Sequence, residues 1–210
     1  MKIIDLTHII DEKMPVFPGT KPPKIIQQNI IKKDGFAEKR ITMCSHTGTH
    51  IDAPSHMIEG GYSLSDFPIE KFIGEGIVIP LETDSFIKLE YLKKFEFEIK
   101  KSSFVLFYSG FDDLWGKKEY FKGFPSLTIE AAKYLMEFNL KGIGIDAVSI
   151  DCMENENFDI HYILLKKNMI IIENLKNLKF LLDKKFELYL TPLKIEGLDG
   201  SPIRAFGKIL

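Results

Sequence analysis

The sequence predicts an α/β fold, with α+β as the alternative, in which one mixed sheet forms a single domain over residues 1–210. Strand patterns dominate the first half of the chain, whereas strand and helix patterns interleave in the second half, as in folds with parallel strands. No repeat, low-complexity tract or Gly/Ser-rich linker divides the 210 residues. A domain of this length buries roughly 70% of its unfolded surface, so folding requires neither a disulfide nor a metal.

The first half is predicted to consist of short strands and loops. In order, these are a strand at 3–6, a Pro-rich loop at 14–20, a hairpin of 25–32 and 36–44 with its turn at 33–35, a long loop at 45–68, and a strand at 76–81. Long loops in compact domains are usually functional or disordered. The three histidines within 45–68 favour function.

The second half is predicted to alternate helices with strands. We expect a helix at 89–95, a buried strand at 103–108, a helix capped by Thr128 that ends near Gly142, a strand at 142–146, a short helix at 158–166, and strands at 169–173, 186–190 and 202–208.

Composition argues against several classes of partner. The net charge of −2 gives no electrostatic reason to expect nucleic acid or an anionic membrane surface. No apolar run approaches the roughly 20 residues that a membrane span needs, and Asp5 and His8 interrupt any signal-peptide core. Cys44 and Cys152 form no paired motif and are expected to be buried free thiols. We therefore expect a cytoplasmic protein.

A cluster of histidines is the strongest functional signal. Of five histidines in the chain, His46, His50 and His56 fall within eleven positions, together with Asp52. A single histidine in a loop is usually a solvated polar residue. A cluster that holds most of the histidines of a protein, beside a carboxylate, is typical of a metal site.

The spacing within this cluster suggests how it is arranged. Gly48 and Pro54 disfavour a helix, so we expect a turn at 47–49 that folds His46 back towards His50. In an extended segment, residues two apart share a face, which would place Asp52 beside His50. Two imidazoles and one carboxylate suit Zn²⁺ or a similar divalent ion and leave coordination positions open for water. Open positions are typical of catalytic sites.

At these residues the sequence resembles the cyclase-like metal hydrolase family, which includes the bacterial kynurenine formamidases (arylformamidases). The family pattern H-x-G-T-H-x-D-x-P-x-H is present in full at residues 46–56. Further similar segments lie at 5–8, 14–19, 144–151, 161–165, 170–175 and 199–205. The resemblance implies a fold of the swivelling β/β/α type and extends over nearly the whole chain.

The resemblance also implies roles for individual residues. His46 and His50 would bind one zinc ion, His161 would bind a second, Asp52 and Glu173 would bridge the two, and His56 would be the general acid/base. The residues by themselves leave two of these roles open, because Glu173 could end a strand that enters solvent and His161 could lie on the polar face of a helix.

Aromatic residues raise the question of substrate contact. Phe17 occupies a Pro-rich loop in which the family commonly carries tryptophan, and it either binds the substrate or packs in the core. Thr20 stands where an aspartate is common. We expect His8 to be structural or to support a ligand, and residues 107–111 and Trp115 to pack in the core.

These observations predict a metal-dependent hydrolase that holds two zinc ions, with manganese as the alternative. The predicted substrate is a small aryl formamide, with N-formylkynurenine of tryptophan catabolism as the best candidate, and His56 would serve as general acid/base. One alternative is hydrolysis of a cyclic amide with a single manganese ion, as in isatin hydrolase, and another is an enzyme tied to polyketide cyclisation. A non-catalytic metal-binding protein is disfavoured by the presence of His56. The family resemblance further implies a homodimer or homotetramer.

Overall fold

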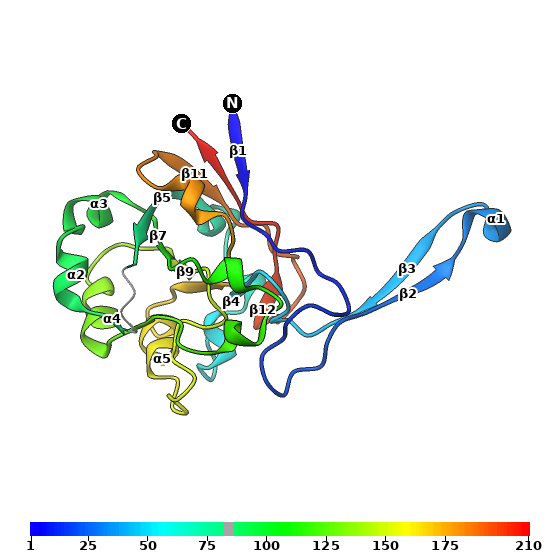
Figure 1. The fold of residues 1–210 in the computed structure, drawn as a ribbon, viewed down its shortest axis with the longest axis horizontal. Coiled ribbons are helices and arrows are strands. Elements are labelled where there is room, and N and C mark those ends of the chain that lie inside the picture. The colour runs from blue at the N-terminus through cyan, green and yellow to red at the C-terminus, as the bar shows by residue number, and fades with distance from the viewer. Residues whose placement is uncertain (82–85) are drawn as a thin grey trace.

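A nine-stranded mixed sheet forms the body of the protein in a computed structural model that describes residues 1–81 and 86–210 (Figure 1). Its strands, in spatial order, are β1 (Lys2–Asp5), β13 (Phe206–Ile209), β11 (Phe186–Tyr189), β5 (Ile73–Pro80), β7 (Phe104–Tyr108), β9 (Gly142–Ile145), β10 (Ile170–Glu173), β4 (His50–Asp52) and β12 (Gly200–Pro202). The central strands β5, β7, β9 and β10 are parallel, and the strands on either side pair antiparallel. The predicted mixed-sheet α/β fold is confirmed.

Short helices connect the central strands. They are α2 (Leu89–Lys93), α3 (Glu96–Lys101), α4 (Ile129–Leu135) and α5 (Asp159–Leu165), with 3₁₀ turns at Pro54–His56, Leu64–Asp66, Ile69–Phe72, Phe111–Leu114, Lys118–Phe121 and Leu178–Leu181. A small parallel pair joins β6 (Phe86–Ile87) to β8 (Ser126–Leu127). The Thr128 side chain caps α4 as predicted, by accepting from the backbone N–H of Ala131. The helix ends at Leu135 rather than near Gly142, because the next residues turn the chain back onto the sheet.

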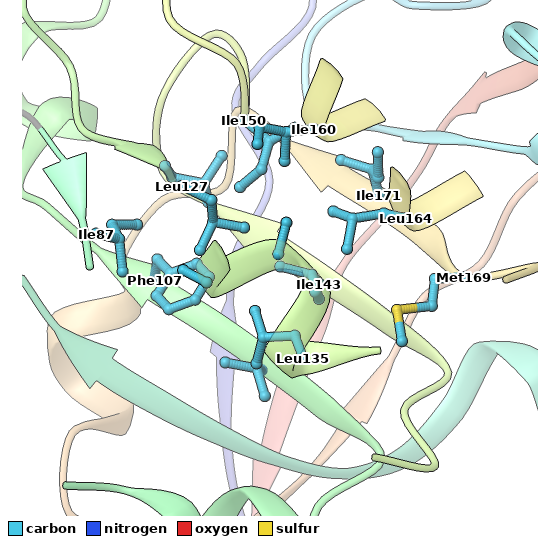
Figure 2. Packing of buried hydrophobic residues seen from close by; sticks show 14 of the residues in the cluster. Ile87, Phe107, Leu127, Leu135, Ile143, Ile150, Ile160, Leu164, Met169 and Ile171 are labelled. Atoms are coloured by element: carbon cyan, nitrogen blue, oxygen red, sulfur yellow. The ribbon is translucent and has the colours of Figure 1, made fainter. Parts of the chain in front are cut away.

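Alternation along the central strands divides the core into two layers. In β7, Phe104 and Leu106 pack on one face of the sheet, whereas Val105 and Phe107 pack on the other. A strand buried on both faces needs such a continuous apolar run. Figure 2 shows the layer that contains Phe107, in which side chains from β7, β9 and β10 meet Leu135 of α4 and Leu164 of α5.

Two predictions from the sequence were partly wrong: the long loop at 45–68 and the single strand at 202–208. Within 45–68, His50–Asp52 is strand β4, which the sheet holds between β10 and β12. At 202–208 the chain instead forms two strands, β12 and β13, that pair at opposite ends of the sheet order. Both differences arise from partners distant in sequence, which local patterns do not reveal.

A hairpin projects from the body of the molecule. It consists of β2 (Lys24–Asn29) and β3 (Glu38–Thr42), with the single helical turn α1 (Ile31–Asp34) at its tip (Figure 1). The pairing agrees with the predicted hairpin, although the strands are shorter. Gly35, at φ 80°, closes the turn in the left-handed conformation that glycine adopts without strain.

The prediction that both cysteines are buried was wrong. Cys44 is exposed and Cys152 is only partly buried. Cys44 lies two residues after the end of β3, the second strand of the projecting hairpin. Within the described ranges, no helix has both the length and the apolar character needed to cross a membrane.

His8 lies outside the histidine cluster, as expected, and is structural. Its ring stacks on Trp115 with 3.9 Å between ring centroids and 8° between planes. Its backbone N–H donates to the hydroxyl oxygen of Thr49, while its Nε2 has no hydrogen-bond partner. Burial, reinforced by the charge of Lys176 and only partly offset by a hydrogen bond to Leu175, lowers the pKa of His8 to about 4.

The low pKa of His8 makes the folded state sensitive to mild acid. The folded protein keeps this ring neutral, whereas in the unfolded chain it takes up a proton near its ordinary pKa of 6.5. Stability is therefore lost as the pH falls from 6.5 towards 4. His8→Phe retains a flat ring against Trp115 but cannot take up a proton. Between pH 7 and pH 5 we expect its free energy of unfolding to fall by about 2 kcal/mol less than that of the parent. Urea unfolding of both proteins at the two pH values measures this difference, and equal losses would contradict it.

Candidate metal centre

The pairing of β4 with β10 brings together two distant parts of the chain. In this antiparallel register His50 lies opposite Glu173, and Asp52 lies opposite Ile171. Ile51 packs in the layer on one face of the sheet, so its neighbours His50 and Asp52 point to the other face. Glu173 points to that face as well, because Ile171, two residues before it, packs there. Three of the predicted ligands therefore share one surface of the sheet.

The remaining two predicted ligands reach this surface from a turn and a helix. Gly48, at φ 65°, makes the turn at 47–49 that folds His46 back, and Nδ1 of His46 lies 2.6 Å from Oδ1 of Asp52. His161 projects from α5, the helix that packs on the same face. Phe158 begins this helix in a left-handed conformation at φ 53°.

The carboxylates of Asp52 and Glu173 both face His50 and His161. His50 Nε2 lies 3.2 Å from Asp52 Oδ1 and 3.5 Å from Glu173 Oε2. His161 Nε2 lies 3.6 Å from Asp52 Oδ2 and 3.3 Å from Glu173 Oε1. Each carboxylate thus directs one oxygen towards His50 and the other towards His161. This arrangement forms two half-sites that share both carboxylates.

The donor set fits divalent cations. Two ligands of one tetrahedral zinc ion, each about 2.0 Å from it, lie about 3.3 Å apart, close to the four separations between the histidine nitrogens and the carboxylate oxygens. Asp52 Oδ2 is buried without a hydrogen-bond partner, an unsatisfied state that a cation would relieve. The His46–Asp52 pair is a direct hydrogen bond, so a cation would replace its proton. The centre can accept one ion in each half-site.

The carboxylates of this centre raise the pKa of its histidines. Burial lowers the pKa of His46, but hydrogen bonds and charges from Asp52 and then Asp199 outweigh it and raise the pKa to about 9. The pKa of His50 is also raised, since the charges of Asp52 and Glu173 overcome its burial. Burial opposes the charge of Asp52, yet the surrounding histidines hold its pKa well below the usual range. Cation binding here must displace protons.

Each histidine of the centre is held through its second nitrogen. His50 Nδ1 donates to the carbonyl oxygen of Gly48 at 2.8 Å, and His161 Nδ1 lies 2.7 Å from Oδ2 of Asp151. His46 Nε2 lies 3.1 Å from Oδ2 of Asp199. Such outer contacts orient metal-binding histidines. Asp151 and Asp199 were not predicted as site residues. The only sequence signal was their position in segments that resemble the family, since nothing in the sequence indicates which histidine each one contacts.

His56 lies beside the centre, at the end of the 3₁₀ turn Pro54–His56. Its ring centroid is 4.0 Å from that of His46 and 6.3 Å from that of His161. Burial lowers the pKa of His56, and the neighbouring charge of His46 adds to the effect, while Asp52 opposes it. A neutral imidazole near the metal-binding side chains can accept a proton and return it. Its catalytic role stays a prediction.

A cavity of about 350 Å³ opens onto these side chains. Its lining includes all six of the metal-binding and catalytic residues predicted from the sequence: His46, His50, Asp52, His56, His161 and Glu173. Apolar side chains also line it, among them Phe17 and Phe158, whose ring centroid lies 6.0 Å from that of His161. Phe17 is 36% exposed, which contradicts core packing and leaves substrate contact as its predicted role. The sequence did not indicate Phe158, which lines the cavity and has a left-handed backbone conformation.

Gly200 makes room for the His46 ring. A Cβ at this position would lie 2.5 Å from His46 Cε1 and 2.9 Å from both His46 Nε2 and the carbonyl oxygen of Ile51. Any side chain at position 200 must therefore displace either the His46 ring or the paired strands β4 and β12. We expect Gly200→Ala to weaken zinc binding by about tenfold or more, as losses around a metal-binding histidine do. Competition with a chromophoric chelator measures the affinity, and an unfolding curve in excess chelator controls for stability. Unchanged affinity in a folded variant would contradict the expected clash.

The comparison with known protein families agrees with this geometry. A family model described as "Putative cyclase" matches residues 4–152, which is more than half of the chain. The chain belongs to the cyclase family. The resemblance identified in the sequence is therefore confirmed.

Relatives of this cyclase-family protein cover nearly its whole length. The kynurenine formamidase of Geobacillus thermodenitrificans is 31% identical over 204 residues, which are 96% of this chain and 95% of the relative. Isatin hydrolase A from Labrenzia aggregata, solved with benzyl benzoate, is 27% identical with a TM-score of 0.88, over 98% of this chain and 93% of that one. A structure described as a potential metal-dependent hydrolase with cyclase activity is 32% identical with a TM-score of 0.81, over 98% and 96%. The chain is thus a cyclase-family member of the metal-dependent hydrolase type.

Proposed function

We propose that this cyclase-family protein hydrolyses a small aryl formamide, with N-formylkynurenine as the first candidate, to an aryl amine and formate. The observation that carries the proposal is the pair of half-sites in which Asp52 and Glu173 each face His50 with one oxygen and His161 with the other. The formamidase relative at 31% identity supports the reaction type. The enzyme class is then an amidohydrolase that acts on linear amides.

Each step of such a reaction can be assigned to particular residues of the centre. Two zinc ions in the half-sites, or manganese in their place, would lower the pKa of water and polarise the carbonyl of the substrate. His46, His50 and Asp52 would hold one ion, and His161 the other, with Asp52 and Glu173 shared. Neutral His56 takes up the proton released by the attacking water. It then donates this proton to the nitrogen of the leaving amine, which would otherwise depart as an unstable anion.

The apolar side chains that line the cavity suit the aryl part of the substrate. Phe17 and Phe158 line the cavity together with the metal-binding side chains. An aryl ring that packs against them would bring its formamide group towards the histidines and carboxylates. Holding the reacting groups close together in this way contributes to catalysis by making the attack effectively unimolecular.

A cyclic amide is the second candidate substrate. The likeness to isatin hydrolase A, at 27% identity and a TM-score of 0.88, favours it. The chemistry is closely related, because water attacks an amide carbonyl and the nitrogen leaves with a proton. In a cyclic amide the amine product stays attached to the acid.

A substrate panel tests the proposal. The protein is freed of metal, reloaded with zinc or manganese, and assayed with N-formylkynurenine, formanilide and isatin, while metal per chain is measured. Turnover of the formamides by enzyme with two ions per chain supports the proposal. Turnover of isatin alone establishes the second candidate, and the absence of any metal-dependent turnover overturns both.

We also propose that the protein forms a homodimer or homotetramer. The projecting hairpin exposes the apolar side chains of Ile26, Phe36 and Ile41, and an isolated two-stranded hairpin is marginally stable in water. Ile41 lies opposite Ile25, so Ile26 and Ile41 point to different faces of the hairpin, and a second copy of the chain that packs around the hairpin would bury both. Sedimentation of the parent and of a variant with Ile26 and Ile41 both replaced by threonine tests this, and a monomeric parent would contradict it.

A further inference from the structure

Asp199 connects two histidines that belong to different parts of the proposed chemistry. It directly precedes β12, and its backbone oxygen accepts from the N–H of Ala53 at 2.8 Å. This bond ties Asp199 to the chain that leads from β4 to His56. Its side chain is 42% exposed at the edge of the centre.

A single oxygen of Asp199 faces both rings. Oδ2 lies 3.1 Å from His46 Nε2 and 3.6 Å from His56 Nδ1. The two rings lie against each other, with 4.0 Å between centroids and 37° between planes. The 3.1 Å contact is a hydrogen bond, whereas the 3.6 Å contact requires a small movement to become one. Contacts of this kind in catalytic sites often shorten when substrate binds.

The position of this oxygen determines which nitrogen of each ring remains available. An N–H donated from His46 Nε2 to Asp199 leaves Nδ1 of the same ring, 2.6 Å from Asp52, free to bind a cation. A proton on His56 Nδ1, directed at Asp199, leaves Nε2 of His56 as the unprotonated nitrogen. Carboxylates select the tautomer of histidines in this manner in many sites.

We propose that Asp199 is a positioning residue that holds His46 in its cation-binding tautomer and His56 in its proton-accepting tautomer. The part concerning His56 rests on the proposed function, whereas the part concerning His46 requires only that the centre binds a cation.

The tautomers can be observed directly. Long-range ¹H–¹⁵N spectra of the zinc-loaded protein distinguish protonated, unprotonated and metal-bound ring nitrogens, and the chain has only five histidines. We expect zinc on Nδ1 and a proton on Nε2 of His46, and a proton on Nδ1 of His56. In Asp199→Ala, His56 should become a mixture of tautomers. Glu196→Ala, which removes an exposed carboxylate three residues earlier, is the matched control and should leave the spectrum unchanged.

Kinetics with two leaving groups separate positioning from general damage. At saturating zinc, Asp199→Ala should lower kcat on formanilide by about 10- to 100-fold and leave KM within about twofold, as loss of an interaction made only in the transition state does. On 4-nitrophenyl formate, whose phenolate leaves without a proton, His56 serves only to take up the proton of the attacking water, so the loss in kcat should be clearly smaller than on formanilide. Asp199→Asn, which keeps an acceptor oxygen without the charge, should fall between the parent and the alanine variant.

Three outcomes would overturn the positioning role of Asp199. Equal losses on the formamide and the ester, or unchanged tautomers in Asp199→Ala, would overturn the proposal. So would a loss of one bound zinc ion per chain that persists at saturating zinc, because it would make Asp199 a direct ligand with His46 and His56. If the parent hydrolyses neither compound, the proposed function fails, and the spectra still decide whether Asp199 selects the tautomers.

Discussion

Asp52→Asn lowers metal-dependent turnover by about a thousandfold or more, the largest effect that we expect from a single substitution. Asparagine has the same shape, but it presents one oxygen and one NH₂ group where both half-sites need an oxygen. The variant therefore loses a shared ligand together with the negative charge that faces three histidines. Metal ions contribute several kcal/mol of transition-state stabilisation, and about 4 kcal/mol corresponds to three orders of magnitude in rate.

Metal content and thermal unfolding measure the consequences of Asp52→Asn. Zinc should raise the midpoint of thermal unfolding of the parent, because it binds the folded state, and should raise that of the variant much less. Asp183→Asn is the matched control. It makes the same chemical change on an exposed turn before β11, at φ 55°, a conformation that asparagine tolerates. A variant that retains both ions and more than a tenth of the activity would refute the bridging role of Asp52.

His56→Gln lowers kcat by about a hundredfold or more while the protein keeps its full complement of metal. General acid–base catalysis typically contributes 10²- to 10⁴-fold, and glutamine cannot exchange a proton near neutral pH. His56 lies outside the paired donors at Asp52 and Glu173, so its loss leaves both half-sites intact.

Two measurements separate this result from a loss of metal. Bound zinc per chain should equal that of the parent, and the loss on 4-nitrophenyl formate should be much smaller than the loss on formanilide. If His56→Gln loses an ion, His56 is a ligand. If it retains full activity on formanilide, His56 takes no part in proton transfer.

The local sequence was sufficient for much of the candidate centre. Gly48 and Pro54 disfavour an α-helix, and Gly48 forms the turn that folds His46 back towards His50. The alternation of residues in an extended segment places His50 and Asp52 on one face, as the structure shows. These relationships depend only on the backbone geometry of a few successive residues, and the local sequence determines that geometry directly.

Elements whose partners are distant were predicted less well. β4 was expected to be loop, since three residues in a polar stretch carry no sustained period, and only pairing with β10 and β12 makes them a strand. Residues 202–208 were expected to form one strand, whereas β12 and β13 pair at opposite ends of the sheet. Strand formation depends on cross-strand neighbours more than on intrinsic preference.

The residues alone were enough to establish a His/Asp cluster suited to divalent ions, a mixed-sheet α/β fold and, through the 46–56 motif, the family. Only the tertiary structure placed Glu173 opposite His50, brought His161 to the same carboxylates and revealed that Asp151 and Asp199 hold two of the rings. The reason is physical: a lone acidic or histidine residue has the same local pattern whether it faces water or a buried partner. Packing of the sheet against α5 and the register between strands more than one hundred residues apart decide between those two environments.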